Sequence, residues 1–190
     1  MNQTNKKPTI ILVAGKAQHG KDSFSKFFKE HLENHPYSQR KVLHIAYGDY
    51  LKYVCGKYFD WNGNKNEAGR TLLQYIGTDV ARTNNDSIWV NVVIELVKGL
   101  GSIYDFVVIS DVRFPNEVTR WQDEGYEVIS VLVEREGFES ELTDEQKNHI
   151  SETAMNDFKF YQHIKSKNLD ELEYNVSRFV KDILFLEKYQ

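Results

Sequence analysis

Apolar residues follow two alternating patterns along the chain: short continuous runs, and stretches in which they recur every three or four positions. The run TIILVA is apolar and β-branched, which is typical of a strand buried on both faces. The stretch DSFSKFFKEHLEN gathers its apolar residues on one side of a helix. Runs of the first kind predict strands at 9–14, 42–46, 105–110, 127–134 and 159–165. Stretches of the second kind predict helices at 22–34, 50–59, 70–83, 88–100, 115–121 and 169–184.

The alternation of strands and helices predicts the fold class. Strands that follow one another through helices pair in parallel with right-handed crossovers. We therefore expect an α/β fold, a three-layer α/β/α sandwich with a mostly parallel sheet. No repeat, low-complexity segment or linker divides the 190 residues, so a single domain over 1–190 is expected. Ligands of such sheets bind beyond the carboxyl ends of the strands.

The segment between the first predicted strand and helix, GKAQHGKDS, nearly matches the phosphate-binding loop G-x-x-x-x-G-K-[ST]. Its glycines let backbone N–H groups turn inward and cradle phosphate at a helix N-terminus. Asp22 stands where the motif has Ser or Thr, and either its carboxylate or the Ser23 hydroxyl is a candidate Mg²⁺ ligand. The predicted ATP-binding residues are Gly15, Lys16, Ala17, Gln18, His19, Gly20, Lys21, Asp22 and Ser23.

A second candidate group lies in VVISDVRFPNE, where Asp111 follows a predicted buried strand and Arg113 comes two residues later. In phosphate-loop proteins an acidic residue at this place lies near the metal or the acceptor phosphate. The planar guanidinium of an arginine suits phosphate oxygens. The alternative interpretation is an aspartate that caps a helix beside a surface arginine. We take Lys21, Asp111 and Arg113 as the catalytic candidates.

Composition and charge restrict the possible functions. A net charge of −4 argues against general nucleic-acid binding, although it allows a local basic pocket. A single cysteine, Cys55, excludes an intramolecular disulfide and suits a reducing compartment. The apolar run IILVAG is too short to span a membrane. We expect a cytoplasmic protein without membrane or nucleic-acid partners, and a homodimer is compatible with the sequence.

The motifs resemble those of a known family. GKD followed by a hydroxyl residue, together with DVRFPNE, resembles the phage-type deoxynucleoside monophosphate kinases, a branch of the P-loop nucleoside monophosphate kinases. YGDYLK, LLQYIGTDVAR and HISE resemble further segments of that family in the same order. The resemblance covers most of the chain. It implies a P-loop fold with a lid, located in a bacterial or phage-infected host cytoplasm, that uses ATP and Mg²⁺ to convert a dNMP into a dNDP.

The resemblance also implies an acceptor-binding region at 47–89 and a lid at about 135–150. The acceptor residues carried over are Asp49, Lys52, Thr78, Arg82 and Trp89. In the lid, Arg135 and Lys147 are candidates to reach the transferring phosphate. A flat wall for the base can come from Tyr47, Tyr50, Tyr75 or Trp89, although each of these aromatics also suits the core.

Two other functions remain open. One is a small-molecule kinase on a related scaffold, of the dephospho-coenzyme A or phosphomevalonate type. The other is a non-kinase nucleotide switch that acts through a partner, for which a large exposed apolar patch is expected. The polar lid and the cations of the acceptor region favour the kinase. Neither the preferred base nor the preferred sugar follows from the sequence.

Overall fold

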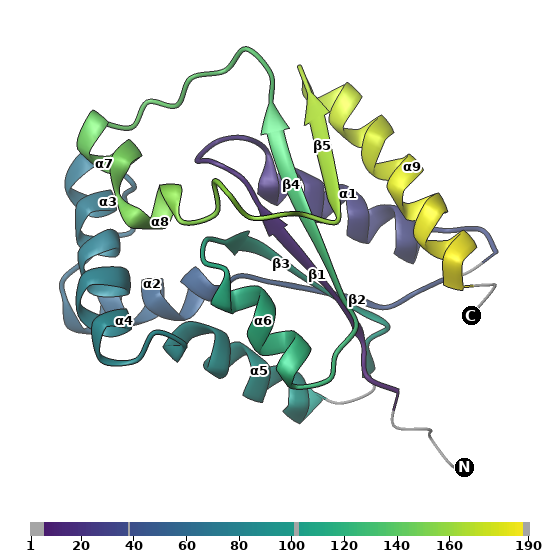
Figure 1. The fold of residues 1–190 in the computed structure, drawn as a ribbon, viewed down its shortest axis with the longest axis horizontal. Helices are drawn as coiled ribbons and strands as arrows, with labels where there is room; N and C mark the ends of the chain where they lie inside the picture. Colours follow the sequence, from purple (N-terminus) through teal and green to yellow (C-terminus); the bar gives the residue numbers. More distant parts are fainter. Residues whose placement is uncertain (1–5, 38, 101–102, 188–190) are drawn as a thin grey trace.

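The computed structural model describes residues 6–37, 39–100 and 103–187. In these residues five strands form one parallel sheet in the order β2-β3-β1-β4-β5 (Figure 1). The strands are β1 (Thr9–Ala14), β2 (Val42–Ile45), β3 (Phe106–Val112), β4 (Val128–Arg135) and β5 (Gln162–Ser166). Because β1 lies in the middle of the sheet, the loop that follows it emerges at the centre of the carboxyl edge.

The sheet is covered on both faces, and β1 shows why its sequence is apolar throughout. Its alternate residues Ile11 and Val13 pack into a core shared with α1 (Lys21–Glu33) and α9 (Leu169–Glu187). The residues between them, among them Ile10 and Leu12, pack into a second core shared with α5 (Ile88–Leu100) and α6 (Asn116–Asp123). Successive side chains of a strand point to opposite faces. The expected α/β/α sandwich is therefore confirmed.

The acceptor region forms a group of helices at one side of the sheet. They are α2 (Tyr47–Tyr58), α3 (Glu67–Gln74), a π-helical segment η1 (Tyr75–Val80) and α4 (Ala81–Asn84). The sequence predicted one helix over 70–83, and the π segment divides it. At its centre the Gly77 carbonyl accepts a hydrogen bond of 2.8 Å from the Trp89 indole. A Cβ on Gly77 would lie 2.5 Å from a methyl group of Leu51, so a larger residue here would require the Leu51 side chain to move.

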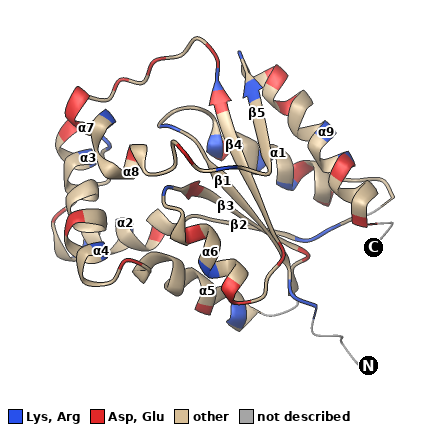
Figure 2. Ribbon diagram, in the orientation of Figure 1, with Lys and Arg blue, Asp and Glu red and all other residues tan. Residues whose placement is uncertain are grey.

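The expected lid contains one short helix, α7 (Asp144–Asn148), and a second short helix, α8 (Ile150–Thr153), follows at its end. The Thr143 hydroxyl and the Gln146 side chain form a reciprocal cap at the start of α7. Gln146 is buried, and its side-chain amide donates to the Glu67 carbonyl (3.2 Å) and the Thr71 hydroxyl (3.3 Å) of α3. The chain from β4 arches over to α3, and this arch is rich in acidic residues (Figures 1 and 2).

Two of the predicted boundaries that were wrong bear on the site. Strand β3 continues to Val112, so Asp111 lies within the strand and not after it. Helix α2 begins at Tyr47, three residues earlier than predicted, because Asp111 binds the backbone at its start.

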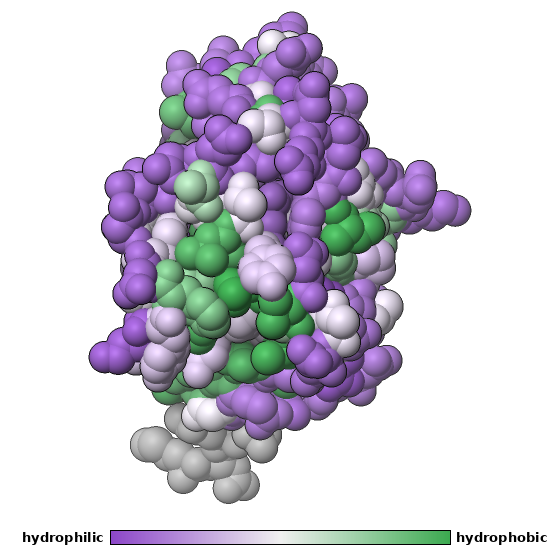
Figure 3. All heavy atoms as spheres, turned by 90° about the vertical axis from the view of Figure 1, so that its left-hand side faces the viewer, coloured by the Kyte–Doolittle hydropathy of each residue, from purple (hydrophilic) through white to green (hydrophobic). Residues whose placement is uncertain are grey.

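Part of the surface on the acceptor side is apolar (Figure 3). Figure 3 shows apolar side chains gathered on the face that lies at the left of Figure 1. Exposed large side chains of this region include Tyr53, Phe59 and Val80. None of the described helices is both long and apolar enough to cross a membrane.

Candidate active site

The loop after β1 has a backbone that depends on glycine. Gly15 has φ +150°, and a Cβ there would lie 2.4 Å from the Val133 carbonyl oxygen. Gly20 has φ +96° and immediately precedes α1. Among the described residues, no side chain caps the start of this helix. Its first N–H groups and its positive dipole end are therefore suited to an anion, as the motif predicted.

Lys21, the first residue of α1, folds back over the loop. Its Nζ donates to the carbonyl oxygens of Gly15 (2.7 Å) and Lys16 (2.8 Å). Burial, together with the nearby charge of Arg113, lowers the pKa of Lys21 from 10.5 to about 8, while Glu152 and Asp111 act in the opposite direction. Lys21 is thus a desolvated cation whose charged form an incoming phosphate would stabilise.

Asp111 connects β3 to the acceptor region. Its two carboxylate oxygens accept the backbone N–H groups of Tyr47 (2.8 Å) and Gly48 (2.7 Å) at the start of α2. A Cβ on Gly48 would lie 2.9 Å from the carboxylate, so glycine allows this approach. Burial raises the pKa of Asp111, and the two backbone hydrogen bonds oppose that rise. The contacts are those of a helix cap, supplied from a distant strand.

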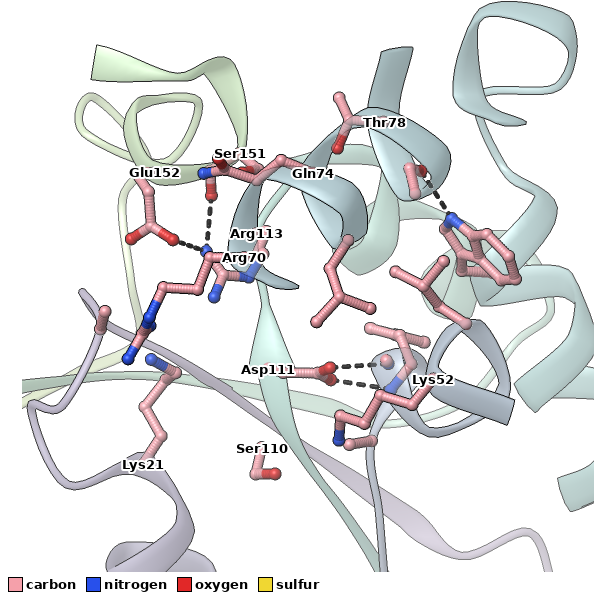
Figure 4. A pocket seen from close by; sticks show the side chains of 18 of the residues that line it. Lys21, Lys52, Arg70, Gln74, Thr78, Ser110, Asp111, Arg113, Ser151 and Glu152 are labelled. Carbon is pink, nitrogen blue, oxygen red and sulfur yellow. Dashed lines mark hydrogen bonds and ion pairs between the residues drawn. The ribbon is translucent and has the colours of Figure 1, made fainter. Parts of the chain in front are cut away.

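Arg113 is held at two points. Its backbone N–H donates to the Glu117 carboxylate (2.7 Å), which fixes the turn after β3. Its NH1 donates to the Ser151 carbonyl (3.0 Å) and forms an ion pair with Glu152 (Figure 4). The Glu152 side chain is only 7% exposed. The guanidinium of Arg113 is therefore tied to α8, at the end of the lid.

Arg82 lies in a buried ion pair. Its NH1 contacts Glu117 at 3.0 Å, its NH2 donates to Asn116 (2.7 Å), and its guanidinium stacks over the Phe114 ring at 3.7 Å. The two charged side chains are 8% and 4% exposed. Burial raises the pKa of Glu117, while hydrogen bonding by the Arg113 backbone and the charge of Arg82 lower it. The pair connects α4 to the first turn of α6.

A cavity of about 480 Å³ joins the phosphate loop to the acceptor region. This volume is in the range of small-molecule sites. Basic side chains line much of it: Lys21, Lys52, Lys65, Arg70, Arg82 and Arg113. Apolar side chains make up another part of the wall: Leu51, Leu73, Trp89, Phe114 and Leu142. Figure 4 shows Lys21 and Lys52 on opposite sides of Asp111, with Gln74 and Thr78 above.

The structure brings many of the predicted site residues to this cavity. Those that line it are Ala17, Gln18, Lys21, Asp22, Lys52, Thr78, Arg82, Trp89, Asp111 and Arg113. Gly15, Lys16 and His19 line a neighbouring cavity of about 260 Å³, which shares Arg113, Ser151 and Glu152 with the first. Gly20, Ser23, Asp49, Arg135 and Lys147 line neither cavity.

Several of the remaining candidates make other contacts. Asp49 forms an exposed ion pair with Lys52 at 2.8 Å. The Arg135 guanidinium lies over the Phe138 ring at 4.5 Å, and its backbone N–H donates to Nδ1 of His19 (3.1 Å). Lys147 is exposed on α7. The arrangement thus places the two predicted lid cations away from the large cavity.

The candidate base wall differs from the predicted set. Tyr47 lines the cavity, but it is buried and belongs to the core, where its hydroxyl accepts a hydrogen bond from the Trp121 indole (2.8 Å). Tyr50 and Tyr75 are about half exposed and do not line the cavity. Trp89 lines the cavity as well. Phe114, which was not among the predicted wall residues, also lines it.

Other cavity residues were also missed: Arg70, Gln74, Ser151 and Glu152. A usable signal existed for most of them. Phe114 lies in DVRFPNE, Gln74 in LLQYIGTDVAR, and Ser151 and Glu152 in HISE, all of which carried the family resemblance. Arg70 precedes Gln74 by one helical turn and so faces the same side.

The residues present fit a magnesium ion that arrives with a nucleotide. No group of three or more His, Cys, Asp or Glu side chains forms a metal site in the described part of the chain. Magnesium commonly binds through one or two carboxylates and the substrate phosphates. The Asp22 carboxylate lines the cavity beside Lys21, whereas Ser23 does not. Asp22 is therefore the better placed of the two candidate ligands.

Comparisons with known proteins show the family and the fold. The family model of deoxynucleotide monophosphate kinases matches residues 47–176. No curated protein sequence matches the chain. Among solved structures, the Mycobacterium tuberculosis APS kinase CysC in complex with AMPPNP and APS is 10% identical over 96% of this chain and 98% of that one, with a TM-score of 0.50.

A Sinorhizobium meliloti gluconokinase is also similar, with 14% identity, a TM-score of 0.49 and coverage of 95% of this chain and 98% of that one. The Bacteroides thetaiotaomicron shikimate kinase is 14% identical over 92% of this chain and 98% of that one, with a TM-score of 0.47. Because the APS kinase is only 10% identical to this chain, its structural similarity shows the fold alone, which is that of the P-loop kinases.

Proposed function

The chain belongs to the deoxynucleotide monophosphate kinase family, and we propose that it transfers the γ-phosphoryl group of ATP to a deoxynucleoside monophosphate, giving ADP and a dNDP. As a member of this family the protein is a phosphotransferase. One observation carries the specific proposal: Lys21 of the phosphate loop and Lys52 and Thr78 of the acceptor region line the same cavity. A donor and an acceptor bound in it would lie next to each other.

At the donor end, the loop N–H groups and Lys21 bind the phosphates of ATP. Lys21 leaves the carbonyl oxygens of Gly15 and Lys16 and turns to the phosphates, where its charge is stabilised. Bound Mg²⁺ would neutralise charge on the transferring phosphoryl group, with Asp22 as the residue that holds it. Phosphoryl transfer depends mainly on such positioning and charge neutralisation.

At the acceptor end, Arg70 is the best placed cation for the monophosphate. Its Nε donates to the Lys65 carbonyl (2.9 Å), and no carboxylate pairs with it among the described residues. Arg82, by contrast, is already neutralised by Glu117. Arg113 lies between the two ends and serves the phosphoryl group in transit. Leu51, Leu73, Trp89 and Phe114 form an apolar wall that suits the base.

The lid excludes water from the reaction. Leu142 of the arch lines the cavity, and Gln146 holds α7 against α3. With the lid docked in this way, the acceptor phosphate and not water meets the transferring group. The Asp111 carboxylate has a supporting role, since it fixes the start of α2 and so the helix that carries Lys52.

The test is ADP release from ATP and Mg²⁺ with a panel of acceptors: the common dNMPs, the matching NMPs, dephospho-coenzyme A and phosphomevalonate. Stimulation by one or more dNMPs is expected. An Arg70→Ala variant should raise KM for that dNMP about tenfold or more, as the loss of a charge-assisted hydrogen bond implies, while KM for ATP stays near its original value.

Stimulation by dephospho-coenzyme A or phosphomevalonate alone would assign the scaffold to another acceptor. ATP binding without stimulation by any acceptor would contradict the kinase proposal and favour a nucleotide switch. Lys57→Ala is a suitable control for Arg70→Ala, because Lys57 is an exposed cation of the same region that does not line the cavity.

A further inference from the structure

Glu152 is a buried carboxylate that the proposed reaction does not yet use. Its side chain is 7% exposed and forms part of the walls of both cavities. It follows the lid directly, in α8, and it pairs with NH1 of Arg113. A carboxylate at this depth needs a charged or hydrogen-bonding partner, and Arg113 supplies one.

Arg113 is bound on one side of its guanidinium only. NH1 contacts both the Ser151 carbonyl and Glu152. Within the described chain, no hydrogen bond involves its Nε or NH2, and the side chain remains 32% exposed. An arginine has five N–H donors in a rigid plane, so a grip on NH1 fixes the direction of the others.

The open side of Arg113 belongs to the site where phosphate is expected. Arg113 lies close enough to Lys21 to be the leading charge that lowers the pKa of that lysine. Figure 4 shows Ser151 and Glu152 on one side of Arg113 and Lys21 on the other. Two neighbouring cations without an anion between them repel each other, and a phosphoryl group between them would relieve that repulsion.

We propose that Glu152 is a positioning residue, which holds NH1 of Arg113 so that the remaining donors of the guanidinium point at the phosphoryl group in transit. This inference rests on the proposed function. Because Glu152 is in α8, the grip also ties the catalytic arginine to the lid. The start of α8 is anchored to the acceptor region as well, because the His149 ring, which precedes the helix, contacts the Asp79 carboxylate of η1 at 3.3 Å. Arg113 is thereby aligned by an element that contacts the acceptor side.

The experiment is a double-mutant cycle on steady-state kinetics, with Glu152→Ala, Glu152→Gln, Arg113→Ala and the double variant Arg113→Ala/Glu152→Ala. We expect Glu152→Ala to lower kcat about 10- to 100-fold, because a misplaced catalytic group loses this much, with little change in either KM. Glu152→Gln keeps an oxygen that accepts from NH1, so its kcat should lie between those of Glu152→Ala and the unaltered enzyme.

The decisive result is the double variant. If Glu152 acts through Arg113, then Glu152→Ala has no further effect once Arg113 is alanine, and the double variant equals Arg113→Ala. If the loss of kcat in the double variant equals the product of the losses in the two single variants, Glu152 acts independently of Arg113 and the proposal is wrong. Unchanged kcat in Glu152→Ala, or an effect confined to KM, would also overturn it.

Two controls keep the outcomes distinct. Glu139→Gln removes an exposed carboxylate of the lid arch and should leave kcat unchanged. Circular dichroism and thermal unfolding report whether each variant folds. If Glu152→Ala fails to fold, the more conservative Glu152→Gln variant still tests the proposal. Failure of the proposed function is separate, because it would appear as absent acceptor-dependent ADP release in the unaltered enzyme.

Discussion

The two ends of the cavity are built in different ways. The donor end depends on one continuous segment, in which Lys21 contacts the carbonyls of Gly15 and Lys16, a few residues away. The acceptor end depends on contacts between distant segments, such as Arg82 with Glu117 and Gln146 with Glu67. A short motif can specify the first kind of site. The second kind exists only after the whole chain has folded.

The two ends also differ in how their charges are balanced. Backbone carbonyls, and not carboxylates, hold Lys21 at the donor end. At the acceptor end Lys52 pairs with Asp49, and Arg82 with Glu117. The donor end therefore keeps its charge for a ligand, whereas much of the charge at the acceptor end maintains the structure. Mutations should separate these two uses of charge.

The largest effect is expected for Glu117→Ala, on stability. The substitution leaves Arg82 buried without its partner, and breaking a buried ion pair costs about 3–5 kcal/mol. Urea unfolding would measure the loss. The matched control is Glu95→Ala, which breaks an exposed pair with Lys98 and should leave stability nearly unchanged.

A double variant sharpens this test. Replacing both partners, as in Arg82→Met/Glu117→Leu, removes the uncompensated charge and should destabilise less than Glu117→Ala alone. If the double variant is the less stable of the two, the hydrogen bonds that Glu117 accepts from the Arg113 and Phe114 backbone matter more than the ion pair.

Lys21→Ala should have the next largest effect, on catalysis without loss of the fold. Removing a preorganised cation from a transfer site lowers kcat by roughly 100- to 1,000-fold. The control is Lys26→Ala, an exposed lysine of the same helix. Unchanged turnover in a well-folded Lys21→Ala protein would refute the donor-end assignment. Retained stability together with lost activity is the opposite of what we expect for Glu117→Ala.

The same contrast explains what could be predicted from the sequence. The strand run TIILVA and the loop GKAQHGKDS carry their information locally, so β1, the phosphate loop and Lys21 could be located. Arg82 was predicted to bind the acceptor. Arg82 lines the cavity, as that prediction requires. Its ion pair with Glu117, 35 residues away, cannot be predicted from the sequence around Arg82 or around Glu117.

Other parts of the site depended on similarly distant contacts. Asp111 was expected past the end of its strand, yet it lies within β3, because that strand pairs with β1 as far as Val112. Phe114 and Glu152 were inside recognised motifs, but only the folded chain shows that their side chains reach the cavity. The parallel pairing of the strands, by contrast, followed from their alternation with helices, and predicting it required no knowledge of such contacts.

Asp22→Asn should have a smaller effect, confined to the metal. If Asp22 holds the ion that ATP brings, loss of its negative charge weakens magnesium binding, and the magnesium concentration for half-maximal rate should rise several-fold. Rate as a function of magnesium at saturating ATP measures this shift. Ser23→Ala is the comparison variant. A shift in Ser23→Ala and none in Asp22→Asn would move the role to the hydroxyl.

The smallest effect concerns pH, and it links Lys21 to Arg113. Lys21 has a pKa of about 8 in the ligand-free protein, and phosphates favour its charged form. Below about pH 8 the lysine is already protonated, so ATP affinity should be nearly constant. Above that pH, binding must take up a proton, and affinity should fall by up to about tenfold per pH unit.

Arg113→Ala should move this fall in affinity to higher pH. Arg113 repels the charge of Lys21, so its removal raises the pKa of the lysine. Calorimetric titration with ATP in the presence of a chelator measures the effect without magnesium. The terminal phosphate of ATP loses its own proton at about pH 6, which is below the range in which Lys21 titrates. The variant also binds ATP more weakly at every pH, so the informative quantity is the pH at which affinity begins to fall. An unmoved midpoint would mean that the two cations do not interact, and that the donor end keeps its charge independently of the residues that face it.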